Sequence, residues 1–152
     1  MSTIICTSNF DGLESIRESV SRLGHEFRLK QLIEINHIEI STESLDQIRR
    51  SDVCIFQSKN ATYQVKKFID LFSKDKKYYA VGIFTAKSVE ASINVDCKYP
   101  RHNYSSKDLI KEYKLDAMSG KKIAILKGNG GLSIIKDTLK AVSYTHHRAH
   151  ET

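Results

Sequence analysis

Short apolar runs alternate with segments of helical periodicity along nearly the whole chain, and this alternation limits the folds that it can adopt. Residues 3–7 (TIICT), 52–58 (DVCIFQS) and 122–126 have the length and composition of buried strands. Between such runs, apolar residues recur every three or four positions, as they do from Leu13 to Leu23. Strands that alternate with helices predict an α/β fold built on a parallel sheet.

The alternation is interrupted at residues 34–40 (EINHIEI), which divide the chain into two parts. Residues 1–33 predict one strand–helix–strand unit, with Gly24 just after its helix. Residues 34–40 alternate apolar and polar side chains, which indicates an exposed linker strand. Residues 41–141 restart a complete series of strands and helices. The 152 residues, 40% of them hydrophobic, suffice for one core, or for one domain with part of another.

Polar residues stand before several of the helical segments and are expected to cap them. Ser41 or Thr42 precedes the helix after the linker, and Asn60 precedes the next one. Ser105 or Ser106 precedes a third.

The chain is basic, with a formal net charge of +6. This excess suits an anionic partner such as nucleic acid, a membrane surface or a polycarboxylate. Lysine pairs such as Lys66-Lys67 are scattered, however, which favours an ordinary solvated surface. Lys76-Lys77 precedes Tyr78-Tyr79, a pattern also found in nucleic-acid binders, but Tyr78 falls in an apolar strand pattern, so core packing is the better interpretation.

The three cysteines, Cys6, Cys54 and Cys97, match no zinc or CxxC spacing. Cys6 and Cys54 fall in strand-like runs, where buried reduced thiols are expected. The odd count and the absence of a signal peptide indicate the reducing cytoplasm. No apolar run approaches the ~20 residues of a membrane span.

Four polar loops follow predicted strands and precede helices. The most conspicuous is Lys127-Gly128-Asn129-Gly130-Gly131, after which Leu132, Ile135 and Leu139 mark the apolar face of the last helix. It lacks the Gly-Lys-Ser/Thr of a phosphate-binding P-loop and the third glycine of a dinucleotide fingerprint. The others are Ser58-Lys59-Asn60-Ala61, Gly82 to Thr85, and Ser105-Ser106. Each alone is equally well explained as a capping turn, but together they place polar helix starts where open α/β sheets bind ligands.

No serine–histidine–aspartate order, carboxylate pair or metal cluster stands out, and His25 and His37 are isolated. Three of the six histidines, His146, His147 and His150, lie in the final residues, without the cysteine or carboxylate partners of a folded metal site. Residues 142–152 show no periodicity that continues the preceding helix. We interpret them as a non-native tail, similar to translated adaptor sequence, and leave them out of the fold interpretation.

The order of the motifs is more specific than any one of them. IFQSKNA (residues 55–61), YYAVGIFTA (78–86), a proline followed by SSKDL (105–109), and GKKIAILKGNGG (120–131) occur in this sequence. The set resembles the uroporphyrinogen-III synthase family over roughly residues 4–140, and GHEFRLKQLIEI (24–35) resembles the start of that family. The resemblance implies two flavodoxin-like parallel-sheet domains. Residues 1–33 would begin a discontinuous domain, 34–40 would form a linker strand, and 41–141 would form an inserted domain.

The resemblance also implies a reaction. The family is a lyase that closes hydroxymethylbilane to uroporphyrinogen III with loss of water and inversion of the last pyrrole ring, through an azafulvene and a spiro intermediate. It uses no cofactor, and uncatalysed closure gives the wrong isomer, so positioning is the main task. The implied chain is a monomer without a metal, nucleic acid or membrane partner. By match to the family pattern, the substrate-contacting residues are Thr7, Ser58, Asn60, Ala61, Gly82, Thr85, Ser106, Gly128 and Gly130.

The sequence departs from the family at two places. Lys127 stands where the family often has arginine, which keeps the charge but loses bidentate geometry. The tyrosine that assists hydroxyl departure in the family is expected beyond this chain, and Tyr144, in the tail, is not given that role. We therefore expect an amino-terminal fragment that is inactive by itself. A flavodoxin-like module that binds a nucleotide or flavin without catalysis remains the alternative, and a basic nucleic-acid binder is supported by charge alone.

Overall fold

The computed structural model describes residues 1–7, 12–32, 34–141 and 146–151, with side chains described as far as residue 141. The chain forms two compact units, Met1–Asn36 and His37–Thr152, each of which is described separately. The division therefore falls inside the predicted linker. Residues 34–41 are assigned to neither helix nor strand. None of the described strands pairs with that segment, so it forms no ladder there, and its role as a linker strand stays a prediction.

The first unit is the predicted strand–helix–strand motif. Strand β1 (Thr3–Cys6) pairs in parallel with β2 (Glu26–Leu29), and α1 (Leu13–Arg22) connects them. Gly24 follows the helix with a φ of +75°, a conformation that favours glycine, and its N–H bonds the carbonyl of Ser21. The helix end was therefore predictable from this one glycine.

The first unit buries very little of its apolar surface, contrary to the expected buried strand. Val20 is the one buried residue among those described in Met1–Asn36, and Ile5 in β1 is 61% exposed. Cys6 is half-buried rather than buried. Two strands and a single helix supply no second layer against the free face of the sheet, so the strand forms without being covered.

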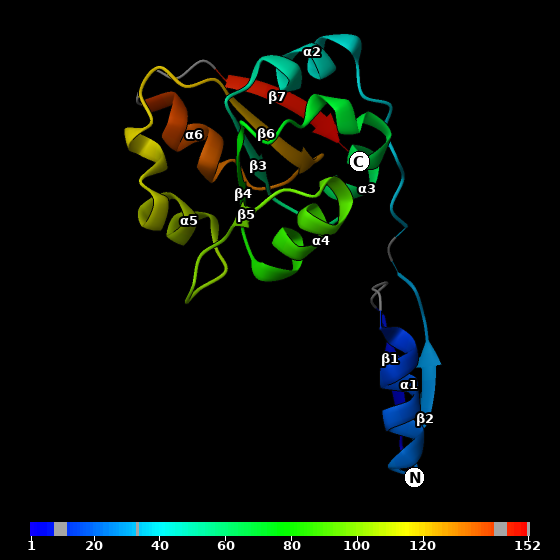
Figure 1. Ribbon diagram of the computed structural model, residues 1–152. Coiled ribbons are helices and arrows are strands. Elements are labelled where there is room, and N and C mark those ends of the chain that lie inside the picture. Colours follow the sequence, from blue (N-terminus) through cyan, green and yellow to red (C-terminus); the bar gives the residue numbers. More distant parts are fainter. Residues whose placement is uncertain (8–11, 33, 142–145, 152) are drawn as a thin grey trace. The chain divides into compact units, whose positions relative to one another are not determined.

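The second unit is a doubly wound α/β domain (Figure 1). The described residues form a five-stranded parallel sheet in the order β5-β4-β3-β6-β7, which confirms the predicted α/β class. Its strands are β3 (Val53–Phe56), β4 (Lys77–Ala80), β5 (Cys97–Lys98), β6 (Ile123–Gly128) and β7 (His146–Glu151). Its helices are α2 (Thr42–Arg50), α3 (Ala61–Val65), the 3₁₀ helix η1 (Lys66–Leu71), α4 (Ile83–Ile93), α5 (Ser106–Tyr113), η2 (Leu115–Ala117) and α6 (Ile134–Ala141).

The winding of this sheet reverses at one place. Counted within the unit, the strand order is 3-2-1-4-5, which matches the first five strands of the classic doubly wound order 3-2-1-4-5-6 and differs from the 2-1-3-4-5 order of flavodoxin. The chain moves from β3 outward to β5, then returns to add β6 on the other side of β3. Ligands of open α/β sheets bind at such a reversal, beyond the carboxyl ends of the strands.

Alternate residues of the central strands build two cores, one on each face of the sheet. Cys54 and Phe56 pack with α2, α3 and α4, whereas Val53 and Ile55 pack with α5, η2 and α6. Figure 1 shows these helices as two layers that enclose the sheet. Burial raises the pKa of the Cys54 thiol to about 11, which confirms the expected buried reduced thiol.

Residues His146–Glu151, in the segment without a predicted strand, form β7, which pairs in parallel with β6. No strand was predicted there, because the tail was left out of the fold interpretation. The exposed edge of β6 offers unpaired N–H and C=O groups, and backbone pairing at an edge does not depend on side-chain periodicity. That these residues are foreign to the natural protein stays a prediction, and Tyr144 lies outside the described residues.

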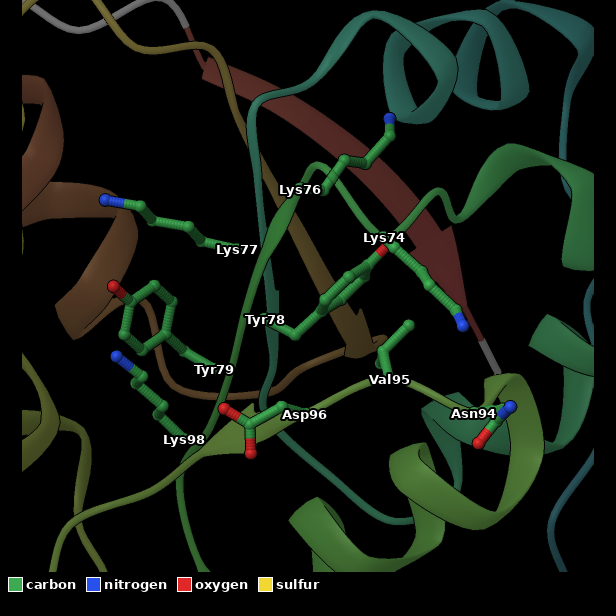
Figure 2. Close-up of a pocket in the computed structure, with 9 residues that line it drawn as sticks. All are labelled: Lys74, Lys76, Lys77, Tyr78, Tyr79, Asn94, Val95, Asp96 and Lys98. Atoms are coloured by element: carbon green, nitrogen blue, oxygen red, sulfur yellow. The ribbon is translucent and has the colours of Figure 1, made fainter.

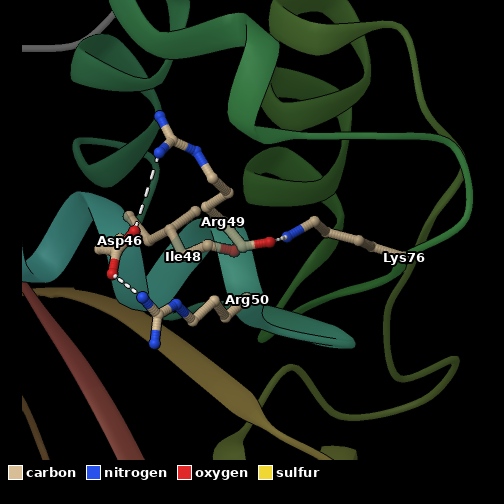
Figure 3. A network of polar contacts seen from close by, with 5 residues as sticks. All are labelled: Asp46, Ile48, Arg49, Arg50 and Lys76. Atoms are coloured by element: carbon tan, nitrogen blue, oxygen red, sulfur yellow. Dashed lines mark hydrogen bonds and ion pairs between the residues drawn. The ribbon is translucent and has the colours of Figure 1, made fainter.

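A lysine from a distant loop closes the carboxyl end of α2 (Figure 3). The Nζ of Lys76 donates to the carbonyls of Ile48 at 2.5 Å and Arg49 at 2.8 Å. The other end begins as predicted, because the hydroxyl of Ser41 accepts the N–H of Ser44 at 3.2 Å. Both ends of α2 are therefore satisfied by side chains.

Replacing Lys76 by methionine should lower the free energy of unfolding by about 1–2 kcal/mol, because the last carbonyls of α2 lose a cationic donor. Urea unfolding followed by circular dichroism measures the change. Lys74→Met is the matched control, since Lys74 is exposed and its replacement removes the same charge. Equal losses in the two variants would contradict a capping role for Lys76.

Candidate functional site

A pocket of about 430 Å³ lies at the carboxyl ends of β3, β4 and β6, where the winding of the sheet reverses. Gln57 and Ser58 follow β3, Val81 follows β4, and Lys127 and Gly128 end β6. The loop before α5 and the loop before α6 complete the wall. Three of the four polar loops singled out in the sequence therefore contribute to one pocket.

The lining has a polar part and an apolar part. It includes two lysines and no carboxylate among the described residues. The polar lining consists of Gln57, Ser58, Ser105, Ser106, Lys107 and Lys127, and the apolar lining consists of Val81, Tyr104, Leu132 and Ile134. Such a pocket suits a ligand that combines acidic groups with a flat or apolar body.

Lys127 is the buried cation of this pocket, with only 7% of its surface exposed. Its Nζ donates to the carbonyl of Gly131 at 2.6 Å. The loop between them turns tightly, with Gly130 at a φ of +75° and the N–H of Gly131 bonded to the carbonyl of Gly128. No ion pair joins Lys127 to a carboxylate in the part of the chain whose side chains are described. The ammonium therefore has donors left for an anion.

The start of α3 differs from the sequence prediction. Asn60 has helical backbone angles and makes no side-chain capping bond, so the expectation that it caps this helix is wrong. The hydroxyl of Ser58 accepts the N–H of Ala61 at 3.3 Å instead. A capping side chain needs an extended backbone to reach over the helix end, and the preceding serine has taken that role.

The start of α5 agrees with the sequence prediction. The hydroxyl of Ser105 accepts the N–H of Asp108 at 3.1 Å and also bonds the Asp108 carboxylate, while Ser106 is the first residue of the helix. The carboxylate of Asp108 already occupies the first turn, so this helix end is not an open anion site. The hydroxyl of Ser106 and the amine of Lys107 remain in the pocket wall.

The predicted site residues fall into three groups. Ser58, Ser106 and Gly128 lie in the pocket lining. Thr7 follows β1 in the first unit. Outside the lining, but in the same unit as the pocket, lie Asn60, Ala61, Gly82, Thr85 and Gly130, of which Ala61 and Thr85 are buried.

Several lining residues were missed by the sequence predictions. Leu132 was assigned to the apolar face of the last helix, but α6 begins at Ile134, and Leu132 is 69% exposed at the pocket. Gln57 carries a buried side-chain oxygen without a hydrogen-bond partner among the described residues. A polar residue that ends a buried strand was the available signal for Gln57. Tyr104 had no signal in its own neighbourhood of the sequence.

A second pocket, of about 450 Å³, is rich in lysine and lies near the amino end of β4 (Figure 2). Figure 2 shows the amino groups of Lys74 and Lys77 pointing away from one another, and Lys76 is engaged with α2. Tyr78 is buried and its hydroxyl donates to the carbonyl of Ser73 at 2.7 Å, as expected for core packing. Because Lys74, Lys76 and Lys77 do not converge, we interpret this face as a solvated surface.

The described residues offer neither a metal-binding cluster nor a membrane-spanning helix. No group of three or more histidine, cysteine, aspartate or glutamate side chains there is placed to hold a metal ion. Each helix in the same residues is too short or too polar to cross a membrane.

Comparison with protein families decides the relationship that the motif order suggested. Residues 14–150 match the family model described as uroporphyrinogen-III synthase HemD. The chain belongs to the uroporphyrinogen-III synthase family. Among relatives of this family, the Proteus mirabilis uroporphyrinogen-III synthase is 25% identical over 147 residues, which cover 92% of this chain and 73% of that protein. The Escherichia coli uroporphyrinogen-III synthase is 30% identical over 105 residues, which cover 65% of this chain and 42% of that protein.

Solved structures of uroporphyrinogen-III synthases share the fold. A mutant uroporphyrinogen III synthase from Thermus thermophilus matches with a TM-score of 0.64 at 12% identity, over 98% of this chain and 60% of that chain. The wild-type enzyme from the same organism matches with a TM-score of 0.54 at 15% identity, over 99% of this chain and 60% of that chain. This chain thus spans about three fifths of the solved synthase structures that it matches.

Proposed function

We propose that the chain acts in the cyclisation of hydroxymethylbilane to uroporphyrinogen III, with loss of water and inversion of the last pyrrole ring. The reaction would be that of a cofactor-independent, cytoplasmic, monomeric lyase. The observation that carries the proposal is the two-sided pocket beyond β3, β4 and β6, with two lysines and no carboxylate in its described lining. The reaction is proposed from the family to which the chain belongs, and the binding role of this chain is proposed from the pocket.

The chemistry of the substrate fits this lining. Hydroxymethylbilane has eight carboxylates on a flexible chain of four pyrroles. Lys107 and Lys127 supply positive charge, and the serines supply hydroxyl donors for carboxylates. The apolar wall suits a pyrrole ring. A flexible substrate whose carboxylates and pyrrole ring are both held would keep the conformation that leads to the type III isomer.

We propose specific roles for the predicted residues that line the pocket. The hydroxyls of Ser58 and Ser106 and the backbone at Gly128 would hold carboxylate arms. The amide of Ala61 is already bonded to Ser58, so its contribution would be to fix that serine. Substrate contacts of Thr7, Asn60, Gly82, Thr85 and Gly130 stay predictions.

The glycine loop argues against a nucleotide as the ligand. Two residues separate it from α6, and Asp137 lies in the first turn of that helix. The hydroxyl of Ser133 donates to the Asp137 carboxylate at 2.5 Å. A carboxylate at this place opposes a phosphate, because both would compete for the positive end of the helix.

Anaerobic equilibrium dialysis against uroporphyrinogen III tests the binding role, with the tetrapyrrole quantified after oxidation to the fluorescent porphyrin. We expect saturable binding that weakens with added salt, and no comparable binding of ATP or flavin mononucleotide. Binding of a nucleotide but not of the tetrapyrrole would overturn the proposal in favour of a nucleotide-binding module. Isomer analysis after incubation with freshly made hydroxymethylbilane tests the separate expectation that this chain alone is inactive, which substantial type III product would contradict.

A further inference from the structure

Gly82, which follows β4, has no side chain, and the side chain of Tyr104 lies close to its backbone. Its φ of −165° is extended backbone that any residue adopts, so its conformation does not require glycine. A Cβ built on Gly82 would lie only 3.1 Å from the Cβ of Tyr104 and 3.3 Å from its Cγ. The missing side chain therefore lets Tyr104 approach the backbone after β4.

Tyr104 is an exposed aromatic side chain held in place at the pocket. It is 54% exposed and belongs to the lining. Its ring meets the ring of Tyr99 edge-on, with centroids 6.3 Å apart, and the carbonyl of Tyr99 accepts the hydroxyl of Tyr113 at 2.9 Å. The ring is supported from Gly82 on one side and from Tyr99 on another, while a large part of its surface stays open.

The pocket lining that contains Tyr104 also contains the apolar Val81 and the exposed Leu132. The cation Lys127 belongs to the same pocket. A lining that combines an open aromatic ring, apolar groups and a cation suits a flat electron-rich ring that carries acidic arms.

We propose that Tyr104 packs against a pyrrole ring of the tetrapyrrole substrate and that Gly82 acts by admitting Tyr104 to the pocket. This inference rests on the function proposed above. It replaces a direct substrate contact of Gly82 by a positioning role. Tyr104 would select for the ring, whereas Lys127 and the serines would select for the carboxylates.

Anaerobic dialysis against uroporphyrinogen III of Tyr104→Phe, Tyr104→Leu and Gly82→Ala tests the proposal. Tyr104→Phe keeps the ring, so its dissociation constant should stay within about twofold of that of the unaltered chain. Tyr104→Leu keeps apolar area but loses the aromatic face, so it should bind about 3- to 10-fold more weakly. Gly82→Ala should weaken binding in the same direction, because the added methyl group displaces Tyr104.

Tyr63→Leu is the matched control, since Tyr63 is exposed on α3, outside the pocket lining, and its replacement should leave binding unchanged. Unfolding midpoints of all variants separate lost binding from lost folding, and Tyr104→Leu tests the proposal by itself where Gly82→Ala fails to fold. If the unaltered chain does not bind the tetrapyrrole, the proposed function falls. If the unaltered chain binds and Tyr104→Leu binds equally well, the role of Tyr104 is overturned while the proposed function stands.

Discussion

Replacing Lys127 by methionine is expected to weaken the binding of uroporphyrinogen III by about 10- to 100-fold, the range for a lost hydrogen bond to a charged group. Lys127 is nearly buried in the pocket wall, and the structure pairs it with a carbonyl rather than with a carboxylate. A carboxylate arm of the ligand would supply the missing countercharge where water is largely excluded. Methionine keeps most of the length and the apolar stem.

Three further measurements make this result specific. Lys122→Met removes the same charge just before the other end of β6, and it should leave the dissociation constant nearly unchanged because Lys122 is exposed and outside the lining. Lys127→Arg should recover part of the affinity, since the charge remains while the geometry changes. Urea unfolding shows whether the lost bond to Gly131 has disturbed the fold. Equal affinities of Lys127→Met and Lys122→Met would exclude Lys127 as an anion anchor.

Amides of the first unit are expected to exchange with solvent about a thousandfold faster, or more, than those of the central strands β3, β4 and β6. The reason is the small amount of apolar surface that Met1–Asn36 buries, with Val20 alone buried among its described residues. The four residues of β3, by contrast, are all buried between two helical layers. Hydrogen exchange of the whole chain, followed by mass spectrometry, measures this difference.

Helices α1 and α4 provide the internal comparison, because they have similar lengths of 10 and 11 residues. They differ in burial, since α1 buries Val20 and α4 buries Thr85, Ala86, Val89 and Ile93. Protection factors should follow that difference. If α1 were as strongly protected as α4, the first unit would owe its stability to contacts other than those described within it.

The sequence predicted the strands and helices well where a local pattern decides them. Ser41 and Ser105 cap their helices as expected, and Gly24 ends α1, because capping and left-handed turns depend on a few neighbouring residues. The prediction that Asn60 caps α3 was wrong, because the hydroxyl of Ser58 bonds the amide at the same helix end. Strand β7 (His146–Glu151) was not predicted, because strand pairing at a sheet edge depends on a distant neighbour, β6.

The position of the site could be predicted from the sheet topology, but most of the side chains in its wall could not. Parallel strands bring their carboxyl ends together, so Ser58, Ser106 and Gly128 meet at one pocket although they are far apart in the sequence. Which side chains fill the wall depends on packing between loops. Tyr104 is at the pocket because Gly82, 22 positions earlier, has no side chain, and no local pattern reports such a relation.

The position of β3 has a consequence for how the binding preference of this protein can change. Each of its residues supports one of the two cores, and the strand is paired on both sides, so substitutions there disturb the whole domain. Gln57 and Ser58 extend directly from it and inherit this constraint. Another part of the lining consists of loop residues that are exposed, among them Tyr104 and Leu132. Tolerated mutations that change the ligand preference should therefore accumulate in these loops, whereas Gln57 and Ser58 should change rarely.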